Sequence, residues 1–200
     1  MLGCGAGILL YLAYALLFTN VGAGRAQGEL RDQWQQAVIA PAAPADPADE
    51  PAAAPAPPVE GVALVEFVRP GSDTPLIHDE PLVVLDDVTA ADLAKGPGHY
   101  PDTALPGDDG NFAIAGHRTT YGAPFFHLDT LRDGDEIRVT APDGARYTYE
   151  IVEQQVVLPG DTWVIDQDPL GNGAPTMTVT TCHPRFSAAE RLVVHAELVS

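Results

Sequence analysis

The sequence is poor in basic side chains and in cysteine. Its 200 residues include 10 Lys and Arg against 28 Asp and Glu, a formal net charge of −18. Because proteins bind nucleic acids through basic side chains that neutralise phosphates, this balance excludes a nucleic-acid partner. The two cysteines, Cys4 and Cys182, lie in segments of very different composition. A disulfide framework is therefore excluded, and Cys182 is expected to be a free thiol.

Paired metal-ligand motifs are also lacking. The chain has no Cys-x-x-Cys and no His-x-x-x-His, so a site built from Cys182, His183 and a distant histidine is disfavoured, and we expect neither a metal nor another cofactor. Acidic runs at 108–109 and 133–136 carry the oxygen ligands that Ca²⁺ prefers. We interpret them as turn and surface acids, which are far more common.

The first 24 residues contain no charged side chain. A helix needs about 20 apolar residues to cross a bilayer, so residues 1–24 are predicted to form a retained transmembrane anchor. A cleaved signal peptide is the competing interpretation, but no basic residue precedes the apolar run and no clear Ala-x-Ala site follows it. The missing basic residues also suggest that the protein starts upstream of Met1.

Residues 25–60 are predicted to link the anchor to a folded domain. Leu30, Trp34 and Val38 are spaced four apart, which indicates a weak juxtamembrane helix at the headgroup boundary or a plain spacer. Residues 41–60 then hold seven prolines and eight alanines, a composition typical of a disordered, extended linker.

The remaining residues, 61–200, form the predicted folded domain. Its apolar residues occur in short β-branched runs separated by Gly, Pro and Asp, which is typical of an all-β barrel or sandwich. Short helices are expected at 89–95, where Thr89 is a candidate cap, and at 123–131. The predicted strands cover residues 62–68, 82–85, 111–115, 136–140, 146–152, 155–158, 162–165, 177–182 and 191–199.

Three side chains that could take part in catalysis lie at the ends of predicted strands. Cys182 ends one strand before His183-Pro184, and Arg191 starts the next, so an antiparallel pair would make them neighbours. His117 ends a third strand and follows Gly116, which permits close backbone approach. A thiol nucleophile, an acid/base and a cation that binds an oxyanion suit acyl transfer. Each residue also has an ordinary structural interpretation, and no spacing decides between the two.

The same segments resemble the sortases, the membrane-anchored cysteine transpeptidases of Gram-positive bacteria, and most of all class E. The family's TLxTC signature appears as Thr178-Val-Thr-Thr-Cys182, with Val179 where Leu is usual. Residues 96–125 resemble the class E block around the catalytic histidine, and residues 181–198 resemble the block that contains the catalytic arginine. The resemblance covers residues from about 62 to the C-terminus.

The resemblance implies an eight-stranded sortase β-barrel in which Cys182 is the nucleophile, His117 the acid/base and Arg191 the oxyanion-binding group. It further implies cleavage of an LAXTG-type C-terminal sorting signal between Thr and Gly, with transfer of the secreted protein to an amine on a lipid II-type peptidoglycan precursor. Tyr121 is a candidate contact for the signal's second position, and Thr181 is a candidate support for the peptide. The catalytic domain is then expected outside the cell membrane, facing the wall.

Two alternatives stay open at this point. A cysteine peptidase of the same fold would hydrolyse the thioacyl intermediate, so it differs only in whether water or an amine attacks second. A non-catalytic anchored β-barrel would bind a wall protein, and it predicts that Cys182→Ala leaves function intact.

Overall fold

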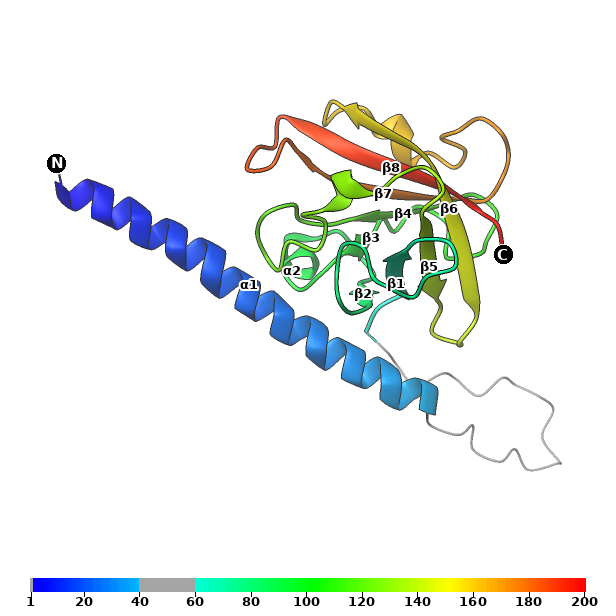
Figure 1. Ribbon diagram of the computed structural model, residues 1–200, viewed down its shortest axis with the longest axis horizontal. Helices are drawn as coiled ribbons and strands as arrows, with labels where there is room; N and C mark the ends of the chain where they lie inside the picture. Colours follow the sequence, from blue (N-terminus) through cyan, green and yellow to red (C-terminus); the bar gives the residue numbers. More distant parts are fainter. Residues whose placement is uncertain (1, 40–59) are drawn as a thin grey trace.

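The computed structural model describes residues 2–39 and 60–200, with side chains placed for residues 18–37 and 60–200. A long helix, α1 (Leu2–Ile39), lies along one side of a β-barrel (Figure 1). The eight strands of the barrel are β1 (Ala63–Val68), β2 (Leu82–Val84), β3 (Gly98–His99), β4 (Asn111–Ala115), β5 (Glu136–Thr140), β6 (Arg146–Val157), β7 (Thr176–His183) and β8 (Glu190–Leu198).

The strands form one sheet in the order β2-β1-β5-β6-β8-β7-β4-β3. The two edge strands approach each other at a bridge between Leu85 and Gly98. The Leu85 amide donates to the Pro97 carbonyl at 2.8 Å, and the His99 amide donates to the Leu85 carbonyl at 2.8 Å. These bonds nearly close the sheet into a barrel, which removes most of the unpaired backbone groups that open edges would expose. The predicted eight-stranded fold is confirmed.

Alternating side chains fill the barrel, as the period of two in a strand requires. In β5, Ile137 and Val139 are buried while their neighbours are partly exposed. Met177 and Val179 of β7 belong to the same core. The opposite face of β7 carries Thr178, which is also fully buried, so this strand is covered on both sides.

Three predicted elements differ from the observed ones. Residues 162–165 form a 3-10 helix, η2 (Thr162–Ile165), because Asp161 closes a turn by accepting from the Leu158 amide at 2.8 Å. The predicted break near residue 153 is a register shift inside the continuous strand β6. The predicted helix at 123–131 shrinks to η1 (Leu128–Thr130), since Ala123 has a φ of 45°.

The short helix α2 (Ala90–Leu93) forms as predicted. The Thr89 hydroxyl accepts from the Asp92 amide, which satisfies one of the free N–H groups at the helix start. β3, which spans only two residues, has no counterpart among the predicted strands.

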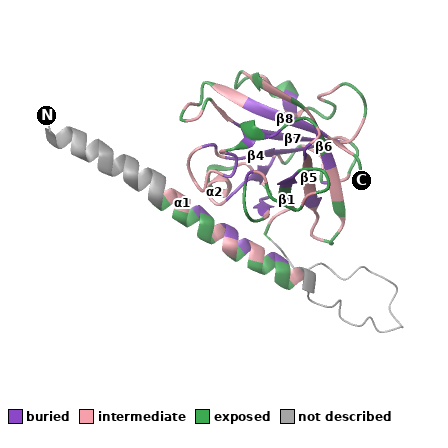
Figure 2. Cartoon of the chain, viewed as in Figure 1, coloured by how far each residue is buried: buried purple, intermediate pink, exposed green. Residues whose placement is uncertain are grey.

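Helix α1 is continuous through the predicted boundary at residue 24, and its second half packs on the barrel. Leu30 and Trp34 are buried against Val83 and Leu85, so this face contacts protein rather than lipid headgroups (Figure 2). Of the helices in the described residues, none is long and apolar enough for a bilayer span. The side chains of residues 1–17, most of the predicted anchor, lie outside the described residues. So do residues 40–59, which include nearly all of the Pro/Ala-rich segment predicted at 41–60.

Candidate active site

Strand register brings the three predicted catalytic residues to one end of the barrel. β4 and β7 run parallel with Ala115 opposite Thr180, so His117 and Cys182, each two residues further along, lie toward the same end of the barrel. β7 and β8 run antiparallel with Cys182 opposite Arg191. Neighbouring strands lie about 4.8 Å apart, which puts the backbones of all three residues within side-chain reach.

His117, Cys182 and Arg191 line one cleft of about 240 Å³. Its walls come from the ends of β4 and β7, the start of β8 and the α2 segment, the last of which contributes Val88 and Leu93. Cys182 is a free cysteine of intermediate exposure. The cleft therefore leaves the thiol partly accessible from outside the protein.

The ring of His117 is half-buried beneath Tyr121. The two ring centroids are 4.8 Å apart with an interplanar angle of 32°. Burial lowers the pKa of His117 below its ordinary value of 6.5, because a charged imidazolium loses hydration there. The ring is therefore predominantly neutral at pH 7, the state in which it accepts a proton.

The peptide unit before His117 fits closely against the core. A Cβ added at Gly116 would lie 2.6 Å from the Phe125 ring, and Phe125 is fully buried. Only glycine permits this approach, which agrees with the sequence-based expectation for Gly116. The Phe125 amide also donates to the His117 carbonyl at 3.2 Å, so the strand end is tied to the core.

Thr181 joins the two catalytic strand ends. Its hydroxyl donates to the Gly116 carbonyl at 2.8 Å, across the parallel pair of β4 and β7. The side chain is buried but belongs to the cleft lining. Because the hydroxyl proton is used within the protein, Thr181 orients the segments that carry His117 and Cys182.

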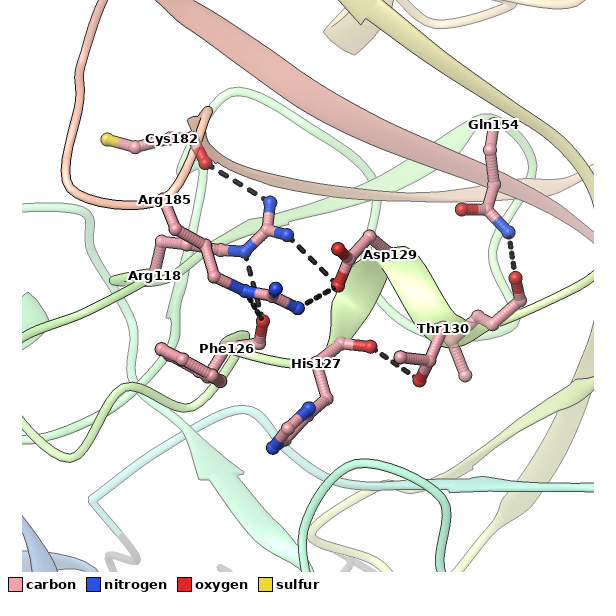
Figure 3. Close-up of polar contacts among 9 residues, drawn as sticks. Arg118, Phe126, His127, Asp129, Thr130, Gln154, Cys182 and Arg185 are labelled. Carbon is pink, nitrogen blue, oxygen red and sulfur yellow. Dashed lines mark hydrogen bonds and ion pairs between the residues drawn. The ribbon is translucent and has the colours of Figure 1, made fainter.

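A buried arginine holds the backbone of the cysteine. Arg118 is 2% exposed, and its Nη1 donates to the Cys182 carbonyl at 3.3 Å while its Nε donates to the Phe126 carbonyl at 3.1 Å. Its Nη2 lies 3.0 Å from the Asp129 carboxylate. Figure 3 shows the Cys182 carbonyl pointing at Arg118 and its sulfur pointing away. The nucleophile's main chain is thus fixed while its thiol stays accessible.

A second arginine reinforces this arrangement. Arg185 donates to the same Asp129 oxygen at 2.6 Å and to the Phe126 carbonyl at 3.1 Å. Its guanidinium carbon lies 4.6 Å from the centroid of the Phe126 ring, within the range of a cation–π contact. The loop after β7 therefore binds Asp129 through Arg185, and the loop after β4 binds the same carboxylate through Arg118 (Figure 3).

Arg191 is partly engaged with its own loop. Its Nη1 donates to the Ala188 carbonyl at 3.2 Å and the Glu190 carbonyl at 2.9 Å. Within the described part of the chain these are the only hydrogen bonds of its side chain, so Nε and Nη2 are available to a carbonyl or oxyanion in the cleft. The loop carbonyls orient the guanidinium, which is permanently charged.

Tyr121 lies at the boundary between two cavities. It stacks on His117 but does not line the cleft that contains Cys182; it lines a separate cavity of about 200 Å³ between α1 and the barrel. The structure therefore places Tyr121 behind the imidazole, and its predicted contact with a sorting signal stays a prediction.

The residues 75–199 match the family model described as the sortase domain. The chain belongs to the sortase family. It is 29% identical to Sortase SrtE1 of Streptomyces coelicolor over 98% of its own length, but it spans only 54% of that relative. A structure of sortase E from Streptomyces avermitilis is 38% identical, with a TM-score of 0.58 over 70% of this chain and 89% of the other.

A Clostridium perfringens Sortase D5 transpeptidase is 35% identical, with a TM-score of 0.58 over 70% of this chain and 79% of the other. Proteins named sortase E are thus among the family members that this chain resembles, and the predicted family is confirmed. Proteins named sortase D and sortase E match this chain at similar identity, so the comparisons show the family and the fold.

Among the residues that the structure describes, no group of three or more His, Cys, Asp or Glu side chains is placed to hold a metal ion. Asp135, from one of the acidic runs, instead accepts from the Arg132 amide at 2.9 Å and lies 3.4 Å from Arg69.

Sequence reasoning missed Arg118 and its partner Asp129. A signal was present, because Arg118 directly follows the candidate histidine in a chain with few basic residues. The pairing with Asp129 is not readable from spacing, since the carboxylate arrives on η1 through an irregular loop.

Proposed function

We propose that the chain is a membrane-anchored cysteine transpeptidase that joins secreted proteins to a cell-wall precursor. The observation that carries this proposal is the meeting of His117, Cys182 and Arg191 in one cleft, in a chain that matches the sortase domain over residues 75–199. The Sortase D5 neighbour, which shares the fold, is described as a transpeptidase.

Acylation begins with transfer of the Cys182 thiol proton to the neutral ring of His117. The sulfur attacks the carbonyl carbon of the signal's threonine, forming a C–S bond as the carbonyl oxygen becomes an oxyanion. Arg191 binds that oxyanion through its available guanidinium N–H groups. When the intermediate collapses, the C–N bond to glycine breaks and His117 returns the proton to the leaving amine.

Transfer repeats these steps in reverse with a new amine. The amine gives a proton to His117 as its nitrogen attacks the thioacyl carbon, Arg191 binds the second oxyanion, and the C–S bond breaks. The proton returns to the sulfur of Cys182, which restores the starting state. Water in place of the amine would yield the hydrolytic peptidase.

The substrates and location are part of the proposal. An LAXTG-type signal and a lipid II-type amine are inferred from the resemblance of residues 96–125 and 181–198 to class E. Residues 1–24, which lack charge, would anchor the protein in the cell membrane with the cleft on the wall side.

The test is incubation of the full chain in detergent micelles with LAXTG and LPXTG peptides, with products read by mass. We expect cleavage between Thr and Gly, and a ligated product when glycine or a diaminopimelate-type amine is added. Cys182→Ala should abolish both products. A folded protein that cuts neither peptide would refute the enzymatic proposal and favour the binding module, and hydrolysis without ligation would favour the peptidase.

Replacement of Arg191 by lysine tests the oxyanion step. Arg191→Lys keeps the charge but not the paired donors, so kcat/KM is expected to fall about 100-fold while the melting temperature stays near that of the parent. Turnover close to the parent's would remove Arg191 from the mechanism.

A further inference from the structure

Helix α1 is fastened to the barrel at a fixed position. The side-chain amide of Gln27 pairs with β2 like a neighbouring strand: its Oε1 accepts from the Val83 amide at 2.9 Å, and its Nε2 donates to the Val83 carbonyl at 3.1 Å. Gln27 is buried, so these bonds are shielded from water. Leu30 and Trp34, one and two turns further along, are buried against the same strand. The helix therefore cannot slide or rotate without breaking the two hydrogen bonds between Gln27 and Val83.

The preceding turns of α1 contact the loop that follows His117. Asn20 Oδ1 accepts from the Gly122 amide at 2.9 Å, and Thr19 Oγ1 accepts from the Tyr121 amide at 3.5 Å. A Cβ at Gly122 would lie 3.2 Å from the Cβ of Ala23, which shows how closely the helix approaches. Figure 1 shows α1 passing along this side of the barrel.

The contacted loop has an unfavourable backbone conformation. Three consecutive residues have positive φ: Tyr121 at 51°, Gly122 at 77° and Ala123 at 45°. For a side chain other than glycine this region costs about 1–2 kcal/mol per residue, so the surroundings must hold the loop in place. The α1 side chains Asn20 and Thr19 supply acceptors for two of its amides.

The loop in turn holds the catalytic ring. Tyr121 stacks on His117 at 4.8 Å, and behind it lies the cavity of about 200 Å³ between α1 and the barrel. If the loop were released, this space would let the tyrosine ring move away from the imidazole. His117 would then lose a wall of its site and gain hydration.

We propose that α1 is a positioning element of the active site, in which Asn20 holds the Tyr121–Gly122 turn and, through the Tyr121 ring, the orientation of His117. The proposal rests on the proposed function only for the role of His117; the contacts themselves do not depend on it. The face of α1 that carries Thr19, Asn20 and Gln27 thus belongs to the catalytic unit rather than to a spacer between anchor and enzyme.

The experiment compares three variants of the full chain in detergent micelles. Asn20→Ala removes the acceptor, Asn20→Asp keeps an oxygen at the same position, and Gln33→Ala alters an exposed amide further along the helix. We expect the acylation rate at saturating LAXTG peptide to fall about tenfold in Asn20→Ala, since small displacements of a catalytic group are costly. Asn20→Asp and Gln33→Ala should stay within about twofold of the parent.

The second readout is the titration of the His117 ring, followed by NMR. In the parent its pKa is lowered by burial; in Asn20→Ala the freed ring gains hydration, so its pKa should rise toward the ordinary value. A general loss of stability, checked by the melting temperature, would not shift this histidine selectively.

Two results would overturn the proposal. One is an Asn20→Ala protein in which the His117 titration is unchanged, whatever its rate. The other is equal rate loss in Asn20→Ala and Gln33→Ala. If the parent itself cleaves no peptide, the proposed function fails, but the His117 titration still decides whether α1 positions the ring.

Discussion

Lowering the pH should reduce the free energy of unfolding because of one buried histidine, His195, that lies outside the cleft. His195 is fully buried, with its Nδ1 2.9 Å from the Thr178 hydroxyl and its Nε2 3.1 Å from the Gln155 amide nitrogen. The Thr178 hydroxyl donates to Asn111 Oδ1 at 2.8 Å, so it accepts the Nδ1 proton. The amide nitrogen of Gln155 is a donor, so Nε2 accepts. The hydrogen bond from Gln155 to Nε2 therefore requires a neutral ring, because a protonated Nε2 cannot accept.

The energetic consequence follows from the pKa. Burial lowers the pKa of His195 from 6.5 to about 4, so between these values the unfolded chain binds a proton that the folded protein excludes. Stability is fully present above pH 6.5 and is lost as the pH falls toward 4. At about 1.4 kcal/mol per pKa unit the full loss is about 3 kcal/mol, of which about 2 kcal/mol appears between pH 7 and pH 4.5.

The assay measures the free energy of unfolding of the parent and of His195→Gln at pH 7 and pH 4.5. Burial also lowers the pKa of His78, His99 and His117, and these groups contribute equally to both proteins. The parent should lose about 2 kcal/mol more than the variant over this range. An equal loss in both would show that His195 is not held neutral, and the reasoning from its hydrogen bonds would be wrong.

The Arg118 network and the glycine before the catalytic histidine give two further predictions. Arg118→Lys replaces a planar group that contacts Cys182, Phe126 and Asp129 by a single point charge. Urea unfolding should therefore show that the free energy of unfolding falls by about 2–3 kcal/mol, and acylation should be slower. An unchanged urea midpoint would contradict this. Gly116→Ala places a methyl group against the Phe125 ring, and we expect a loss of about 1–3 kcal/mol by thermal melting, whereas parent-like stability would show that the ring yields freely.

The local sequence pattern is sufficient to predict most of the strands, but not the irregular segments. The strands at 111–115 and 136–140 were predicted to the residue, because each is a short apolar or alternating run bounded by Gly and Asp. Thr162–Ile165 carries the same β-branched signal, yet the turn at Asp161 turns it into η2. A run of four residues without a ladder partner follows its flanking turn rather than its propensity.

The cleft was predictable where it depends on strand ends, and unpredictable where it depends on packing between distant loops. Cys182 and Arg191 are close in sequence, and their pairing follows from one hairpin. The contact of Asn20 with Gly122 joins residues 102 apart, and no periodicity in either segment encodes it. The spacing of Leu30 and Trp34 correctly marked an apolar face, but the sequence does not say that β2 is what that face covers.

The parallel pairing of β4 with β7 has a consequence for biosynthesis. The two strand ends that carry base and nucleophile are separated by 65 residues, which include all of β5 and β6, so they cannot meet until those intervening strands have been made and have paired. A nascent chain that ends before Cys182 therefore holds the base His117 without its nucleophile. The protein therefore cannot catalyse a reaction until the C-terminal third of the chain has been synthesised.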